Sequence, residues 1–206
     1  MPTHCILQVE ASAVPPTRRS GCPINLTLEQ LGDRWSLIVI RDLMFGNRRS
    51  YGELLDRSEE GIASNILADR LKRLVGAKLL SRRTDPAHAQ RGIYSLTEAA
   101  IELLPLLVHM GAWGVRHTRP SRALSVRAQI LAQGGPPLWA AFMDELRHLH
   151  LGARPPAHSV FAELQAAYEA AMAGRRSSAA TAARAGPRAA YPRREAAPRP
   201  ARTRRA

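Results

Sequence analysis

Residues 61–83 read Gly-Ile-Ala-Ser-Asn-Ile-Leu-Ala-Asp-Arg-Leu-Lys-Arg-Leu-Val-Gly-Ala-Lys-Leu-Leu-Ser-Arg-Arg, and this stretch decides the fold. Leu67, Leu71, Leu74 and Val75 recur with helical spacing, so they lie along one side of an α-helix. Gly76 follows them and predicts the end of that helix. The opposite side is polar and carries Asn65, Asp69, Lys72 and Arg73, with Arg70 at its edge. The helix therefore packs on a core with one face and presents hydrogen-bonding groups with the other.

A short extended run follows this helix, and a second one begins at Gly92. The first contains Leu79, Leu80 and the pair Arg82 and Arg83, and the second reads Gly-Ile-Tyr-Ser-Leu over residues 92–96. Between them lies a polar link that ends at Arg91. Two short runs joined by such a link predict an antiparallel ribbon with a basic tip.

The residues before the helix predict a second, shorter helix. Ser50-Tyr51-Gly52-Glu53 has the spacing of a capping box, in which the first and fourth side chains satisfy each other's backbone N–H groups. The polar link over residues 58–61 has the right length for a turn between two helices. The order of helix, turn, helix and ribbon predicts a helix-turn-helix with a wing.

These segments resemble the HxlR family of bacterial winged-helix transcriptional regulators. The resemblance rests on Cys22-Pro23-Ile24, Gly32-Asp33-Arg34-Trp35, Tyr51-Gly52-Glu53-Leu54, Gly61-Ile62 through Leu74, and Arg91-Gly92-Ile93-Tyr94-Ser95-Leu96-Thr97-Glu98. Their order and spacing span residues 20–118, about half of the chain. The resemblance implies a mostly α fold with a small β-wing, and a homodimeric regulator, most simply a repressor, that binds an inverted repeat in double-stranded DNA.

The side chains expected to contact DNA lie on the helix and on the wing: Ser64, Asn65, Asp69, Arg70, Lys72, Arg73, Arg82, Arg83 and Arg91. An Asn side chain can pair with adenine and an Arg side chain with guanine, whereas Lys suits phosphate. Wing arginines suit the backbone or the minor groove. The carboxylate of Asp69 either accepts a hydrogen bond from cytosine or holds Arg70 or Arg73. A solvated charged face stays an alternative explanation of the same pattern.

Three further helices are expected around this unit. Residues 23–31 form an amphipathic helix, and residues 34–45 are apolar on more than one side, which predicts the central helix of the core. A long helix opens at Thr97, and its Pro105 is expected to kink it unless it falls in the first turns. This last helix has two apolar stripes, of which one core can cover only one. The second stripe is covered either by a second copy, giving a two-fold dimer, or by C-terminal helices of the same chain.

Composition divides the chain into four parts. We expect a flexible arm at 1–20, the winged domain at 21–118, a helical extension at 119–173 and a disordered tail rich in Arg, Ala and Pro at 174–206. The tail carries ten arginines against one carboxylate, so it supplies nine of the thirteen net positive charges. The competing hypothesis is therefore a winged-helix module for protein interaction, whose tail binds nucleic acid without sequence preference.

Two cysteines, Cys5 and Cys22, give no disulfide framework. Cys22 is a candidate oxidant sensor, because a helix cap beside Arg18 and Arg19 stabilises a thiolate. A silent or structural Cys22 is the alternative, and an unidentified small-molecule effector is also expected. We expect His148 and His150 to be surface residues that bind no metal. The sequence contains no pattern of catalytic residues and no cofactor-binding motif, so we expect neither an enzyme nor a cofactor. Without a signal peptide or an apolar run long enough to cross a bilayer, the chain is expected to be cytoplasmic and associated with the nucleoid, with no membrane partner.

Overall fold

A computed structural model describes residues 20–184, apart from the side chains of Ala89 and of residues 175–184. Its elements are α1 (Pro23–Leu31), α2 (Ser36–Gly46), α3 (Tyr51–Asp56), α4 (Ser64–Gly76), β1 (Leu80–Asp85), β2 (His88–Leu96), α5 (Glu98–Ile101), α6 (Leu104–His117), α7 (Arg122–Leu151) and α8 (Val160–Arg184). The two strands form one antiparallel sheet. The mostly α fold with a small β-wing, predicted from the sequence, is confirmed.

Helices α3 and α4 form the predicted helix-turn-helix. Ser50 caps α3, accepting from the backbone N–H of Glu53, and the Glu53 carboxylate accepts in return from the Ser50 N–H at 3.0 Å. The Tyr51 hydroxyl donates to the backbone oxygen of Ser64 at 2.8 Å and ties the start of α3 to the start of α4. The buried face of α4 consists of Leu67, Leu71 and Leu74, so the predicted apolar stripe is the one that packs.

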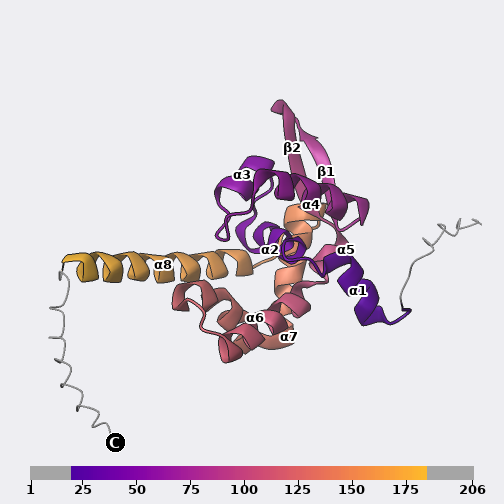
Figure 1. The fold of residues 1–206 in the computed structure, drawn as a ribbon. Helices are drawn as coiled ribbons and strands as arrows, with labels where there is room; N and C mark the ends of the chain where they lie inside the picture. The colour runs from indigo at the N-terminus through magenta and orange to yellow at the C-terminus, as the bar shows by residue number, and fades with distance from the viewer. Residues whose placement is uncertain (1–19, 185–206) are drawn as a thin grey trace, which may run out of the picture.

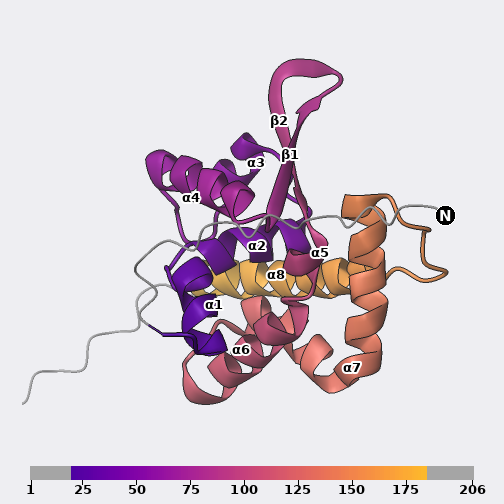
Figure 2. The ribbon, with the colours of Figure 1, turned by 90° about the vertical axis from the view of Figure 1, so that its right-hand side faces the viewer.

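The wing projects from the molecule beside α4 (Figures 1 and 2). Its register pairs Leu80 with Leu96 and Arg82 with Tyr94. Strand β2 begins at His88, earlier than the expected Gly92, because His88 still pairs with Asp85 across the ribbon beyond a register shift between Thr84 and Asp85. The buried ends Leu80 and Leu96 attach the wing to the core.

One hydrophobic core joins the winged unit to the C-terminal helices. As predicted, α2 is central: Ile40, Leu43 and Met44 are completely buried. Phe142 of α7 and Leu164 of α8 belong to the same cluster. The helices after residue 118 are therefore part of the same folded body, and their apolar faces close a core that the winged unit leaves open.

The predicted long helix is divided into α5 and α6. The break falls at residues 102–103, so Pro105 lies in the first turn of α6, where its missing N–H has no helical partner to lose. By length and composition alone, the span Glu98–His117 is apolar enough to cross a membrane, contrary to the sequence expectation. The break divides that span, and Ile101, Leu104 and Val108 within it are buried in the protein core.

The described C-terminal part consists of two helices. Helix α7 begins at Arg122 and bends at Gly135, whose φ of 62° and ψ of −164° are not helical. Helix α8 continues to Arg184, so the boundary at 173 is wrong: residues 174–184 are Ala- and Arg-rich, a composition that favours helix. The arm over residues 1–19 and the tail beyond Arg184 lie outside the described residues.

Candidate nucleic-acid interface

The outward face of α4 is free of intramolecular partners at most of its polar positions. Ser64, Asn65, Asp69, Lys72 and Arg73 are all exposed. Among the residues that the structure describes, none forms a hydrogen bond or an ion pair with the side chain of Asn65, Lys72 or Arg73. These three side chains are therefore available to a ligand that approaches α4 from solvent.

Arg70 has a different position from the one predicted. Its side chain is only 17% exposed, and its Nη1 lies 3.4 Å from Oδ2 of Asp33, in the loop between α1 and α2. Its Nη2 lies 3.4 Å from Asp69, which makes the partner of Asp69 its chain neighbour rather than Arg73. Because this guanidinium faces the protein, Arg70 fixes the position of α4 and is not free to read a base.

Asp33 explains why Gly-Asp-Arg-Trp precedes α2. Its Oδ1 accepts from the backbone N–H groups of Trp35 at 2.8 Å and Ser36 at 3.0 Å, and its Oδ2 accepts from the Ser36 hydroxyl. Burial raises the pKa of the Asp33 carboxyl, but the hydrogen bonds from Ser36 and Trp35 outweigh this effect and hold that pKa below its usual value. The carboxylate of Asp33 thus caps the start of α2 and also contacts α4. The Gly-Asp-Arg-Trp motif includes this residue, but residue spacing alone did not predict its contact with α4.

The wing presents the predicted cations. Arg82 and Arg83 are exposed on β1, and Arg91 is exposed on β2. Arg91 lies 3.8 Å from the carboxylates of Glu53 and Asp85, distances that leave it weakly held and able to exchange to a phosphate. Strands β1 and β2, which carry these arginines, lie on the same side of the molecule as α4 (Figure 1).

Arg48 and Arg49, in the link between α2 and α3, are engaged inside the protein. Arg49 donates to the backbone oxygens of Tyr94 at 3.2 Å and Leu149 at 2.9 Å, and to the Ser95 hydroxyl. Burial, together with the charge of Arg83, lowers the pKa of Arg49. Arg48 is ion-paired with Asp42 at 3.0 Å. Both arginines are structural, and Arg49 ties the wing to α7.

His150 was predicted to be a surface residue, but it is buried. It is 5% exposed, and its Nδ1 accepts from the backbone N–H of Leu96 at 3.3 Å. Burial, with the nearby charge of Arg49, lowers the pKa of His150 to about 4. Glu145 is also buried and caps α8, accepting from the N–H of Phe161 at 2.7 Å. Within residues 20–184 no group of three or more His, Cys, Asp or Glu side chains is placed to hold a metal ion.

Cys22 lies at the N-cap of α1 and is exposed. Its backbone N–H donates to the Ser20 hydroxyl at 3.0 Å. The predicted place at a helix cap is therefore confirmed. Arg18, Arg19 and Cys5, which entered the sensing hypothesis, lie outside the described residues.

Apolar side chains are exposed on α1 and α6, away from the wing. The predicted second stripe of the long helix is only partly covered: Leu103 and Leu107 pack against the core, whereas Leu106, Met110 and Trp113 stay exposed. Trp113 is 57% exposed, and Leu28 of α1 is 60% exposed. Helix α7 covers the other side of α6, where a Cβ on Gly111 would come within 2.9 Å of the Cβ of Ala128.

The fold and the site define a winged helix-turn-helix protein with an exposed recognition face. Residues 30–122 match the HxlR-like helix-turn-helix family. A candidate regulatory protein of Fusobacterium mortiferum, MalR, is 34% identical over 93 residues, 45% of this chain and 87% of that protein. The chain therefore belongs to the HxlR-like helix-turn-helix family of transcriptional regulators.

Two further likenesses cover similar parts of the chain. An uncharacterized HTH-type transcriptional regulator of Mycobacterium tuberculosis strain H37Rv, Rv3095, is 35% identical over 97 residues, 47% of this chain, and the match spans only 60% of that relative's length. The solved structure of PA1607, described as a candidate transcription factor, is 31% identical and covers 50% of this chain and 70% of that one, with a TM-score of 0.46.

Proposed function

We propose that this protein is a sequence-specific regulator that binds a short inverted repeat in double-stranded DNA as a homodimer and represses transcription from it. The observation that carries the proposal is the free polar face of α4, where Asn65 and Arg73 are exposed with no partner among the described residues. Asn and Arg side chains form the paired hydrogen bonds that distinguish adenine and guanine in the major groove.

The remaining predicted contacts divide by chemistry. Ser64 and Lys72 suit phosphates beside the groove, and Arg82, Arg83 and Arg91 suit the backbone or the minor groove next to the wing. Asp69 pairs with Arg70, and its side chain is exposed, so its carboxylate can accept a hydrogen bond from a cytosine amino group. Arg70 itself acts by positioning α4, as its contact with Asp33 supports.

The exposed apolar residues of α1 and α6 support the dimer. A monomer that leaves Leu28, Met110 and Trp113 in water gains free energy by burying them against a second copy. A two-fold interface brings the same patch of both subunits together and presents two α4 helices, spaced about one turn of DNA, roughly 34 Å apart.

Binding of upstream DNA tests the proposal. The protein truncated after Arg184, which retains all of α8, is compared with the full chain on its own upstream fragment and on a shuffled fragment of equal length, at moderate and at high salt. We expect both proteins to prefer the upstream fragment by about a thousandfold or more, within the range of specific over non-specific binding.

The alternative is a protein-interaction module in which the chain beyond Arg184 supplies the nucleic-acid affinity. That part holds seven arginines and one glutamate. Under this alternative, truncation abolishes binding, and the full chain shows no preference for the upstream fragment and loses affinity steeply with salt. This result would replace the regulator with the interaction module.

Control by Cys22 and by an effector completes the proposal. Exposure at the cap of α1 makes the thiol of Cys22 accessible to an oxidant. Because α1 carries part of the exposed apolar surface, a modified Cys22 would act on the dimer rather than directly on α4. A DNA-binding regulator with these properties would work in the cytoplasm, at the nucleoid.

A further inference from the structure

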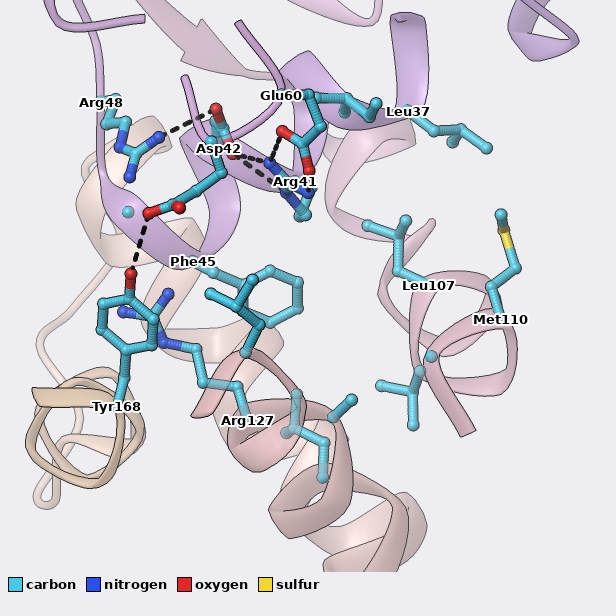
Figure 3. A pocket seen from close by; sticks show the side chains of 18 residues that line it. Leu37, Arg41, Asp42, Phe45, Arg48, Glu60, Leu107, Met110, Arg127 and Tyr168 are labelled. Atoms are coloured by element: carbon cyan, nitrogen blue, oxygen red, sulfur yellow. Dashed lines mark hydrogen bonds and ion pairs between the residues drawn. The ribbon is translucent and has the colours of Figure 1, made fainter. Parts of the chain in front are cut away.

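A cavity of about 430 Å³ lies between α2, α6, α7 and α8, and none of its lining residues belongs to α4 (Figure 3). This volume lies in the range of pockets that bind small organic molecules, about 300–1,000 Å³. One wall comes from the winged unit through Leu37 and Phe45 of α2 and Leu107 of α6. The other comes from Leu131 of α7 and Tyr168 of α8. Helices α7 and α8 lie almost wholly beyond residues 30–122, the part that matches the family.

The cavity combines an apolar lining with a charged rim. Three guanidinium groups, those of Arg41, Arg48 and Arg127, reach it. Two of them are neutralised inside the protein. Arg41 donates to both oxygens of Glu60, at 2.6 and 2.8 Å, and Arg48 is ion-paired with Asp42 at 3.0 Å. The positive charges of Arg41 and Arg48 are therefore largely balanced by these carboxylates and attract an anionic ligand only weakly.

Arg127 is the exception. It lies across the ring of Tyr168, with its Cζ 4.1 Å from the ring centroid, and it donates to the Leu164 backbone oxygen and to Gln165. These partners are all neutral, and no carboxylate of the described residues lies within ion-pair distance of it. Figure 3 shows its side chain extending from α7 toward Tyr168, and both residues line the cavity. Burial lowers the pKa of Arg127, and the charges of Arg48 and Arg41 add to this lowering, while Tyr168 and the charge of Asp42 oppose it.

We propose that this cavity binds an amphipathic organic monocarboxylate, with its carboxylate on Arg127 and its apolar body against Phe45, Leu107 and Leu131. A half-buried guanidinium without a counter-ion favours an anion, and a carboxylate matches its planar donors. The apolar lining selects a hydrocarbon body. The carboxylates of Asp42, Glu59 and Glu60 also face the cavity, so a ligand with two or more negative charges is repelled.

The same site is linked to the helix-turn-helix. Glu59 and Glu60 belong to the turn between α3 and α4, and both are held from the cavity side. The Tyr168 hydroxyl donates to Glu59 at 3.1 Å, and Arg41 holds Glu60. A carboxylate on Arg127 lies beside Tyr168, where it repels Glu59 and competes for the hydroxyl. Resting on the proposed function, this step makes the ligand an effector that shifts the turn and weakens DNA binding.

Titration calorimetry on the DNA-free full-length protein tests the site. The probes are 2-naphthoate and octanoate, with 2-naphthamide as the neutral counterpart of the first. We expect saturable binding of one or both carboxylates, with 2-naphthamide weaker than 2-naphthoate by about tenfold or more, the value of a charge-assisted hydrogen bond. In Arg127→Gln, which retains a polar side chain, carboxylate affinity falls by about the same factor.

Arg122→Gln is the matched control, because Arg122 is an exposed residue of the same helix outside this cavity. It should bind the probes as the wild type does, and thermal melts establish that both variants fold. Saturable binding of neither carboxylate, or equal affinity for 2-naphthoate and 2-naphthamide, overturns the site. So does equal carboxylate affinity in Arg127→Gln and the wild type.

A second measurement separates the site from the function. The saturating carboxylate should weaken binding to the upstream DNA fragment in the wild type and do so less in Tyr168→Phe, which lacks the hydroxyl that holds Glu59. An unchanged DNA affinity with the probe bound overturns the link to the turn. Failure of the ligand-free protein to prefer upstream DNA overturns the proposed function alone and leaves the binding site standing.

Discussion

Arg70 of α4 lies with its Nη1 3.4 Å from the carboxylate of Asp33, the residue that starts α2. This contact joins the helix with the exposed polar face, α4, to the start of the central helix of the core, α2. We expect Arg70→Gln to lower the free energy of unfolding by about 1–2 kcal/mol, because a partly buried carboxylate loses a charged partner. Chemical denaturation of Arg70→Gln, Asp33→Asn and the double variant measures it, and the control Arg73→Gln, at an exposed position, should change little.

In Arg70→Gln, the affinity for DNA should fall by the same factor on the upstream and the shuffled fragments, because we propose that Arg70 positions α4 and does not contact a base. A loss confined to the upstream fragment would instead assign Arg70 to direct base recognition. Additive effects of the two single substitutions on stability would show that Arg70 and Asp33 do not interact energetically.

The free face of α4 gives the second prediction. Asn65→Ala and Arg73→Ala should each reduce affinity for the upstream fragment by about tenfold or more and leave shuffled DNA nearly unaffected, because a paired base contact contributes about 1–3 kcal/mol. Arg91→Ala should weaken binding to both fragments alike and lower the salt dependence, since a wing cation contacts phosphate. Fluorescence anisotropy with both fragments measures each variant. Uniform losses for all three would refute the assignment of α4 as the recognition helix.

The third prediction concerns the dimer. Leu28→Glu and Trp113→Glu should each shift the protein from dimer to monomer, because a charge in an apolar interface loses its hydration without a partner. Leu151→Glu is the control: Leu151 is also an exposed leucine, 48% exposed, but it lies at the end of α7. Analytical ultracentrifugation decides between the states. A monomeric wild type, or equal behaviour of Leu28→Glu and Leu151→Glu, would place the interface elsewhere.

The fourth prediction follows from His150. Its pKa, lowered to about 4 by burial and by Arg49, lies below the value of about 6.5 for an unfolded histidine. The unfolded chain therefore binds the proton more readily, so stability is complete at neutral pH and is lost as the pH falls below about 6.5. Between pH 7 and pH 5 this one group should remove about 2 kcal/mol.

His150→Asn keeps an acceptor for the N–H of Leu96 and cannot titrate, so its stability should be nearly flat over that interval. Denaturant melts at several pH values measure both proteins. Glu53 and Glu60, whose pKa values are also lowered, lose their contribution only in more acidic solution, which keeps the interval above pH 5 diagnostic. Parallel pH profiles for the two proteins would contradict a neutral buried His150.

A fifth prediction tests the sensing hypothesis for Cys22. If oxidation of this exposed thiol controls the protein, diamide should reduce binding to the upstream fragment in the wild type and have no effect on Cys22→Ser. The measurement is an anisotropy titration with and without diamide, followed by reduction with dithiothreitol to restore binding. An identical response of the two proteins would leave Cys22 a structural cap.

The sequence alone determined the local structure of the winged unit. Leu67, Leu71 and Leu74 have helical spacing and are the buried face of α4, and Ser50 with Glu53 forms the capping box that their spacing predicted. Such features depend on residues within one or two turns of each other, so periodicity and capping chemistry suffice to find them. The exposed candidates of α4 and the wing were found in the same way.

Only the tertiary structure decided which charged side chains are free. The sequence pattern made both Arg70 and Arg73 candidates for contact with DNA, yet Arg70 faces Asp33, from a distant loop, and Arg73 faces solvent. His150 is buried because β2, far earlier in the chain, lies against α7. Arg127 enters a cavity only because α7 and α8 fold back onto α2. Burial and counter-ions come from contacts between distant segments, and local spacing carries no record of them.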